Sequence, residues 1–344
     1  MSLRDQLLDA SKRAAEVLDG AQAKQRVQED GYTRVDPVAI AEADGVPVMM
    51  RPLEKLLGAF LQPNGMPGIL VNSRRPVGLL HLTCAHELGH YFLGHDTAAD
   101  EHLEYGDKAA PHEQAANEFA FKLLMPRWLL LYVMQRKGWG RRHLQHAEIV
   151  YQLSLRLGVS YQAMIWQLKQ FNWLTPGTAT ILNKVQPKAL KEAALAGVIE
   201  MPRDGGDVWL LDPSDRDVVI EPRATDRFLF RLPSHASAGY IWAIDEAVDA
   251  GFTIRPVLRD VSHEAKPAGP VVTGAQHDMQ YVLEARDATT ESTDTLPVAL
   301  AERRPWEPPG AELEHLSLHA KYEAHPDGLS LGTRQRHLKE ALQG

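Results

Sequence analysis

The feature that most constrains the fold is a change in hydrophobic periodicity near residue 200. Before this point apolar residues recur mainly at helical spacing, with a few short apolar stretches such as "GILVN" between them. After it come eight short runs that alternate with period two and have no helical stretch between them, from "DVWLL" to "LSLHAKY". Such a series predicts an all-β, immunoglobulin-like sandwich with one face of each strand buried. The chain is therefore expected to be an α+β multidomain protein.

The 344 residues are enough for two or three domains of roughly 100–200 residues each. We expect a mixed α/β domain over 1–140, a helical segment with a connector over 141–200, the β-sandwich over 201–325, and a charged helical tail over 326–344. In the helical segment, "LGVSYQ" places a short Gly-containing turn between two helices, with Ser160 as the expected N-cap. This is typical of a helix-turn-helix and also of a helical hairpin packed on the first domain, which we favour.

Composition excludes several classes of protein. The net charge of -8 does not favour a general nucleic-acid binder, which would need a clustered basic surface. The first residues lack the apolar core of a signal peptide, and the longest apolar run, "WLLLYVM", is far shorter than a membrane span of about 20 residues. The single cysteine, Cys84, excludes an internal disulfide. We expect a cytoplasmic protein with no membrane or nucleic-acid partner.

The stretch "LTCAHELGHYFLGHD" contains the pattern His-Glu-x-x-His. On a helix, residues four apart lie on nearly the same side, so His86 and His90 can reach one ion. Glu87 lies beside them, where a carboxylate can take a proton from a water molecule, and this is why the spacing suits metallopeptidases. With fifteen histidines in the chain, a surface helix rich in histidine remains the alternative.

A catalytic zinc ion normally has three protein ligands, so a third residue is required from another element. The helix predicted for "HEQAANEFAFKLLMP" offers Glu113 and Glu118. At about 100° per residue, Glu113 borders the apolar face, whereas Glu118 lies about 140° away and is expected to face water. Asn117 shares the side of Glu113 and could hydrogen-bond a ligand. An acidic residue in the first helical turn is also favoured by the helix dipole, so spacing alone leaves Glu113 open.

Other groups near the motif are assigned lesser roles. His95 could replace Glu113 as third ligand, but it follows Gly94, where the helix is expected to end. Cys84 lies about 200° around the helix from His86 and is expected to be a buried, inert thiol. Three more histidines are expected at the surface or in loops: His81, His102 and His112. The group that stabilises a tetrahedral oxyanion could be His102, Tyr105 or His112.

Four stretches together resemble the ImmA/IrrE metallopeptidases in their order and separations: "DPVAIAEADGVPV", "GILVN", "LTCAHELGHYFLGH" and "HEQAANEFAFKLLMP". With the helical pair that follows, the resemblance covers about residues 34–182. It implies a zincin-like fold for the first domain and a helix-turn-helix-like region after it. It also implies one Zn²⁺ per chain with ligands His86, His90 and Glu113, and Glu87 as general base.

Members of that family are typically paired with helix-turn-helix transcriptional repressors, which they cleave to switch on mobile-element or stress-response genes. The resemblance therefore implies a zinc-dependent endopeptidase whose substrate is such a repressor or a similar regulator. The residues themselves do not identify the substrate.

The β region resembles the chagasin-like inhibitors of papain-type cysteine peptidases. "SHASAGYIW", "VTGAQHDMQYVLEA" and "RRPWEP" follow the order of their three binding loops. The implied partner-binding residues are Tyr240, Trp242, Gly274, Arg304, Pro305 and Trp306. His235-Ala236 stands where the family has Asn-Pro, and the second loop lacks a partner for its glycine, which argues against tight peptidase inhibition. We expect a domain that binds a partner or substrate; Trp242 and Trp306 could instead belong to the sandwich core.

Two other functions remain open. The chain could be a peptidase-inhibitor or protein-binding module with a regulatory or vestigial zinc site, although the intact His-Glu-x-x-His favours the peptidase. It could also be a DNA-binding regulator that acts through residues 160–171. That helix offers Lys169 but few other side chains that read bases, which makes this the weakest hypothesis.

Overall fold

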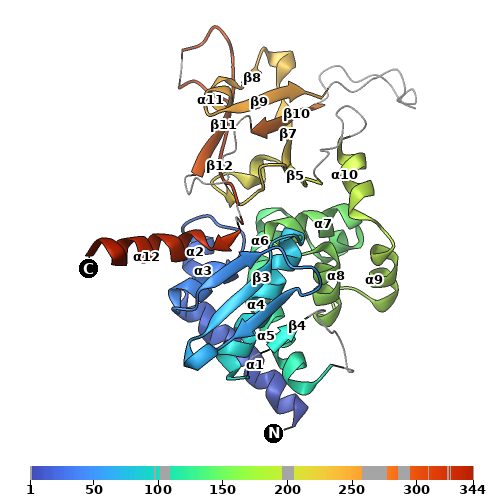
Figure 1. Cartoon of the computed structure of the whole chain (residues 1–344). Helices are drawn as coiled ribbons and strands as arrows, with labels where there is room; N and C mark the ends of the chain where they lie inside the picture. The colour runs from blue at the N-terminus through green and yellow to red at the C-terminus, as the bar shows by residue number, and fades with distance from the viewer. Residues whose placement is uncertain are drawn as a thin grey trace. The chain divides into compact units, whose positions relative to one another are not determined.

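The chain forms two compact units, Met1–Lys184 with His325–Gly344, and Val185–Ala324. Figure 1 shows the elements of the computed structural model. It describes residues 2–96, 98–100, 109–195, 205–257, 277–285, 295–308, 310–323, 325 and 327–343. The first unit mixes helices with a sheet and the second is built mainly of strands, which confirms the predicted fold class. These units divide the chain differently from the four expected domains, because the helices up to residue 184 and the C-terminal residues both belong to the first unit.

The first unit contains one five-stranded sheet in the order β13-β1-β3-β2-β4. β1 and β3 are parallel, and the other neighbouring pairs are antiparallel. The strands are β1 (Val48–Arg51), β2 (Gly58–Leu61), β3 (Gly68–Asn72), β4 (Ala98–Asp100) and β13 (Gly328–Leu329). The helices are α1 (Leu3–Gly20), α2 (Ala23–Gln28), α3 (Pro37–Ala43), α4 (Val77–Leu93), α5 (Pro111–Leu124), α6 (Arg127–Arg136), α7 (Ala147–Arg156), α8 (Tyr161–Gln170), α9 (Pro176–Asn183) and α12 (Leu331–Gln343).

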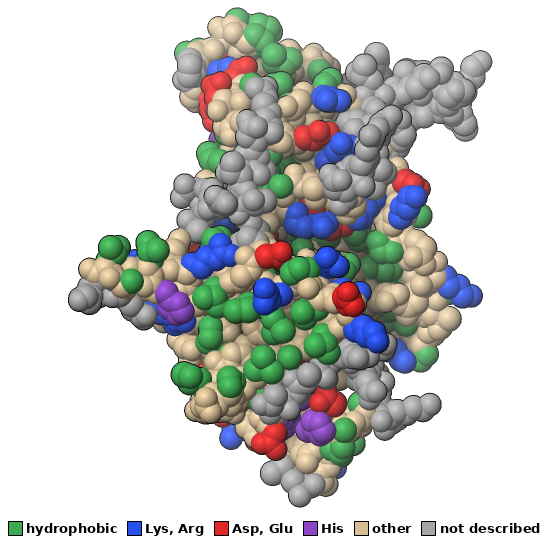
Figure 2. Space-filling model, in the orientation of Figure 1, with side chains coloured by type: hydrophobic (Ala, Val, Ile, Leu, Met, Phe, Trp, Pro, Cys, Tyr) green, Lys and Arg blue, Asp and Glu red, His purple; other side chains and the backbone are tan. Residues whose placement is uncertain are grey.

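The sheet supports α4, the helix that carries the His-Glu-x-x-His pattern. Alternate residues of β1 and β3, together with Phe60 of β2, are almost fully buried, and α4 packs against β2 and β3. The other face of the sheet carries the cross-strand neighbours Leu329, Met49 and Leu70, and Met49 is 37% exposed. Figure 2 shows hydrophobic side chains gathered over the strands of this unit. The sheet thus buries one face under α4 and presents apolar groups on the other.

Helices α7 and α8 are joined by the predicted short turn. Gly158 ends α7 with a φ of +65°, and the Ser160 hydroxyl accepts a hydrogen bond from the amide of Ala163, 3.2 Å away. Most of α8 is buried within the first unit, and Gln167 donates to the carbonyl of Met125. Its exposed side chains are those of Gln162, Lys169 and Gln170.

The C-terminal residues complete the first unit. β13 pairs with β1, and the N-terminus of α12 contacts Glu42 at the C-terminal end of α3. The Glu42 carboxylate accepts hydrogen bonds from the Ser330 hydroxyl and from the amide of Thr333, 3.0 Å away. The Thr333 hydroxyl lies 3.3 Å from the same carboxylate oxygen and is fully buried. A carboxylate thus satisfies one of the first amide groups of α12, as a helix N-terminus favours.

Replacing Thr333 with valine should lower the free energy of unfolding of the first unit by about 0.5–1.5 kcal/mol, since valine removes the buried Thr333 hydroxyl, whereas the Ser330 hydroxyl still donates to Glu42. Urea unfolding of the full chain measures this change. The same substitution in a Glu42→Gln background should have a smaller effect, because the two side chains are coupled. Equal effects in both backgrounds would show that the contact does not stabilise the unit.

The second unit holds two four-stranded sheets with the orders β5-β7-β10-β9 and β6-β12-β11-β8. The indole of Trp242 donates to the carbonyl of Pro233, and Glu302 accepts from the amide of His235, each at 2.7 Å. Both contacts join one sheet to the other. The strands of the second unit are β5 (Val208–Leu211), β6 (Val219–Ile220), β7 (Arg227–Ser234), β8 (Ile241–Ala243), β9 (Phe252–Pro256), β10 (His277–Ala285), β11 (Thr295–Arg303) and β12 (Glu314–Lys321). Its described helices are α10 (Pro187–Leu195) and α11 (Asp245–Asp249).

None of the helices in the described ranges combines the length and the apolar character that crossing a membrane requires.

Candidate metal centre

The centre is built on α4, which is buried over most of its length. His86, Glu87 and His90 have no exposed surface. The helix continues to Leu93 and ends at Gly94, whose φ of +69° is the left-handed conformation that glycine adopts readily. The two imidazoles lie one turn apart, with ring centroids separated by 4.8 Å.

Glu113, in the first turn of α5, brings a carboxylate to these two rings. The Nε2 atoms of His86 and His90 lie 3.1 Å apart. Glu113 Oε2 is 3.1 Å from Nε2 of His86, and Oε1 is 3.6 Å from Nε2 of His90. The structure therefore brings together the three residues expected as ligands, and they form one of the groups of described residues that could hold a metal ion.

This donor set suits a zinc ion. Tetrahedral zinc with bonds of about 2.0–2.1 Å to histidine nitrogen requires ligand atoms roughly 3.3 Å apart. The observed separation of 3.1 Å between the two Nε2 atoms is close to this value. Two imidazole nitrogens and one carboxylate also leave a fourth position for water, as in catalytic zinc sites.

The close approach of α4 and α5 depends on Gly89, the fourth residue of the His-Glu-x-x-His pattern. A Cβ atom at this position would lie 3.0 Å from the carbonyl oxygen of Ala116 and 3.1 Å from its Cα atom. Any larger side chain would push α5, and Glu113 with it, away from the histidines. We did not single out Gly89 from the sequence, although a glycine inside a helical pattern is a signal of close packing.

Each of the three residues contacts a further polar side chain. Nδ1 of His86 lies 3.1 Å from Oδ1 of Asn117, the contact expected from the sequence. Because the amide oxygen can only accept, Nδ1 carries the proton and Nε2 keeps its lone pair for an ion. His90 contacts His95 through their Nδ1 atoms at 3.0 Å, and Glu113 contacts Nε2 of His112 at 3.0 Å.

The protonation of the site follows from these contacts. The neighbouring rings of His86 and then His90 hold the pKa of Glu113 well below its usual value, so the carboxylate is ionised at neutral pH. Burial, and then the neighbouring His90, lower the pKa of His95 to about 4, so this ring is neutral there.

Glu87, the expected general base, lies under strand β2. Gly58 approaches it so closely that a Cβ atom there would lie 2.9 Å from Oε1 of Glu87 and 3.0 Å from the carbonyl oxygen of Leu70. Only a glycine leaves this space, and nothing local in the sequence marked it, because Gly58 and Glu87 belong to different elements.

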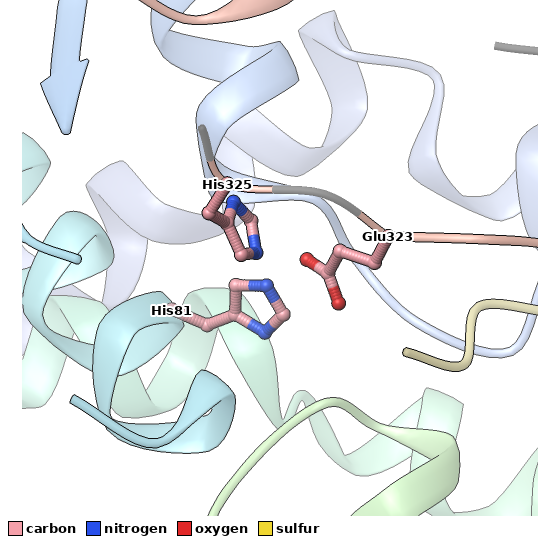
Figure 3. Close-up of side chains that lie close together, drawn as sticks. All are labelled: His81, Glu323 and His325. Atoms are coloured by element: carbon pink, nitrogen blue, oxygen red, sulfur yellow. The ribbon is translucent and has the colours of Figure 1, made fainter. Parts of the chain in front are cut away.

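Two predictions about side-chain environment are wrong. Glu118 lies away from the centre, but instead of facing water it accepts a 2.8 Å hydrogen bond from Ser11 of α1. His81, expected at the surface or in a loop, is 1% exposed within α4 and contacts Arg34 and the carbonyl of Gly158, at 2.9 and 2.7 Å. Its ring meets His325 edge to face, as Figure 3 shows, with centroids 5.7 Å apart. The partners responsible are all distant in sequence.

The other residues near the motif agree with the predictions where the structure describes them. Cys84 is buried, and burial raises the pKa of its thiol well above the usual value, as expected for an inert cysteine. His112 is 56% exposed at its side chain, and His95 follows the end of α4. His102 and Tyr105 lie outside the described residues.

The expected partner-binding residues of the second unit separate into two groups. Trp242 is 6% exposed and belongs to the core. Trp306 is 71% exposed and packs over Gly239, where a Cβ atom would lie 2.7 Å from the indole. The Arg304 guanidinium lies 4.5 Å from the ring centroid of Tyr240. Pro305 joins Arg304 to Trp306, and Gly274 lies outside the described residues.

Residues 41–169 match the family model of peptidase M78, described as the IrrE N-terminal-like domain. This segment is similar to the IrrE N-terminal-like domain. It extends from α3 to α8 and therefore contains all three residues of the metal group. The match confirms the first resemblance, and it supports a metallopeptidase-like regulatory protein.

Among solved structures, two similar chains are reported. The crystal structure of the cysteine protease inhibitor EhICP2 from Entamoeba histolytica is 16% identical over 34% of this chain and 95% of that chain, with a TM-score of 0.24. The solution structure of Amebosin is 19% identical over 35% of this chain and 100% of that chain, with a TM-score of 0.25. The inhibitor is of the class that the second resemblance names, but TM-scores this low carry no argument about function. No curated protein matches the chain.

Proposed function

We propose that the chain is a zinc-dependent endopeptidase with one Zn²⁺ held by His86, His90 and Glu113. The observation that carries the proposal is the convergence of these three donors from α4 and α5, with Glu87 on the same helix, inside an IrrE-like domain. The contact of His86 with Asn117 orients the ring so that its Nε2 atom faces the other two donors, as a metal ligand requires.

In this proposal Glu87 and Glu113 have different roles beside the metal ion. A bound zinc ion supplies Lewis-acid polarisation of a water molecule and of the scissile carbonyl. Glu87 accepts the proton of the attacking water and delivers it to the leaving amine. The ionised Glu113 supplies the negative charge of the ligand set, and its position is fixed by the contact of α5 with Gly89.

We propose that the substrate is a helix-turn-helix transcriptional repressor or a similar regulator in a stress-response or mobile-element switch. The support is the kinship of residues 41–169 with the IrrE domain. The absence of a second cysteine fits a protein that works in the cytoplasm.

Two measurements test this function. The purified chain should contain about one zinc ion per molecule by elemental analysis, and a chain without zinc or another divalent ion would weigh heavily against the proposal. Co-expression with the regulators encoded beside it should yield one discrete cleavage of one of them. If the chain contains zinc but none of these regulators is cleaved, the substrate assignment fails while the metal site stands.

A second role is favoured by the exposed Trp306. A large aromatic side chain held over a glycine, beside the Arg304–Tyr240 pair, is typical of a protein-binding surface. We propose that the second unit binds a protein partner or the substrate. Replacing Trp306 with alanine should weaken retention of the cleaved regulator, whereas Leu313→Ala, at an exposed apolar residue of the same unit, should not. Titration of papain with the full chain tests the alternative of peptidase inhibition.

A further inference from the structure

The three proposed ligands are each held by a different polar side chain. Asn117 contacts His86, as the sequence suggested. The other two contacts involve histidines that lie outside the ligand set, His95 beside His90 and His112 beside Glu113. The His-Glu-x-x-His pattern by itself assigns no role to these two histidines.

His95 is brought back to the site by the end of α4. The left-handed conformation of Gly94 turns the chain, and the amide of His95 donates to the carbonyl of His90 over 2.9 Å. This backbone bond sets the two rings at a centroid distance of 5.1 Å, with 3.0 Å between their Nδ1 atoms. When Nε2 of His90 serves as a ligand, Nδ1 of that ring carries the proton, so Nδ1 of His95 must accept it. The pair then fixes the tautomer and orientation of His90.

His112 acts on the carboxylate from the other side. It precedes Glu113 in the first turn of α5, and its Nε2 atom lies 3.0 Å from Oε1 of Glu113. This distance places the imidazole nitrogen in polar contact with the carboxylate oxygen. The ring also lies 5.9 Å from that of His95 and 6.2 Å from that of His90. The contact therefore restricts the rotation of the carboxylate.

We propose that His95 and His112 are positioning residues that fix the orientation of His90 and Glu113 for metal binding. The proposal rests on the proposed function, because it assumes that these two residues are ligands. Groups that orient metal ligands typically contribute 10- to 100-fold to metal affinity. Since neither histidine is itself a ligand, the effect depends on one ring nitrogen in each, Nδ1 of His95 and Nε2 of His112.

Matched substitutions separate the polar contacts of His95 and His112 from the packing of their rings. His95→Leu removes the acceptor, whereas His95→Asn places an amide oxygen near the position of Nδ1. His112→Leu removes the polar contact with Glu113, whereas His112→Gln places an amide nitrogen near the position of Nε2. His337→Leu, at an exposed histidine of α12, is the remote control. For each full-length variant, zinc affinity is measured by competition with a chromophoric chelator, the visible spectrum is recorded with Co²⁺, and the thermal unfolding of the metal-free protein is followed.

His95→Leu and His112→Leu should each bind zinc about 10- to 100-fold more weakly and change the Co²⁺ spectrum. The Asn and Gln variants and His337→Leu should stay close to wild type. If His95→Leu and His112→Leu bound zinc as wild type does, the proposal would be overturned. Asn and Gln variants that unfold like wild type yet bind as weakly as these two leucine variants would also overturn it. A wild-type chain that binds neither Zn²⁺ nor Co²⁺ would instead overturn the proposed function, and the positioning roles with it.

Discussion

Replacing Glu87 with glutamine should reduce the rate of substrate cleavage by about 100- to 10,000-fold while zinc stays bound. Glutamine has nearly the same shape as glutamate, so it fits the space under Gly58 where the buried side chain lies. Its amide cannot accept and return the proton of the attacking water. Because Glu87 is not one of the three residues of the metal group, the substitution leaves the proposed ligands in place. The measurement is kcat/KM on a verified substrate, together with the zinc content of the purified variant.

The control for this variant is Glu54→Gln, which makes the same change at an exposed position of the first unit. It should cleave at the wild-type rate. A Glu87→Gln chain that kept zinc and cleaved as fast as wild type would rule out the assigned general base. A chain that lost its zinc would show instead that Glu87 supports the metal group, and this too would contradict the separation of roles.

The parts of the site that are local in sequence were predictable. The four-residue spacing of His86 and His90 determines that both rings lie on one side of a helix, whatever that helix packs against. The angle between Glu113 and Glu118 determined which of the two faces the apolar side, and the structure places Glu113 against the histidines. Asn117 followed from the same helical spacing.

The parts that depend on packing between distant segments were not predictable. Gly58 and Gly89 permit close approaches, and neither approach can be seen until β2 and α5 are placed against α4. β13 has only two residues, too few to show periodicity, and its partner β1 lies far back in the chain. The burial of His81 could not be predicted because its partner Arg34 lies far away in the sequence, between α2 and α3.

The structure of the β region was also only partly predictable from the sequence. The period-two pattern predicted the strands, but α11 spans only five residues and does not interrupt that pattern enough to be recognised as a helix. The roles of the tryptophans could not be separated either. Trp242 and Trp306 have the same chemistry, and the sequence does not show which of them is buried. In the structure Trp242 lies in the core, whereas Trp306 packs over Gly239 at the surface.

Replacing Glu113 with alanine should reduce the bound zinc from about one ion per chain to a small fraction and abolish cleavage, because two histidines do not make the three-ligand set of a catalytic zinc site. Glu118→Ala is the matched control, since it removes the same group five residues further along α5. That variant should keep its zinc and its activity. It should lose about 0.5–1.5 kcal/mol of stability, because the 2.8 Å hydrogen bond between Ser11 and Glu118 is lost.

Elemental analysis and urea unfolding of both alanine variants distinguish the two glutamates. The pair should give opposite results, with metal content falling in one variant and only stability falling in the other. If Glu113→Ala retained a full equivalent of zinc, the third ligand would have to be another group. His95 would then be the first to examine, because it already contacts His90 at 3.0 Å. If Glu118→Ala lost the metal as well, the effect would come from α5 as a whole, which packs on both α1 and α4, and the assignment of Glu113 as a ligand would lose its support.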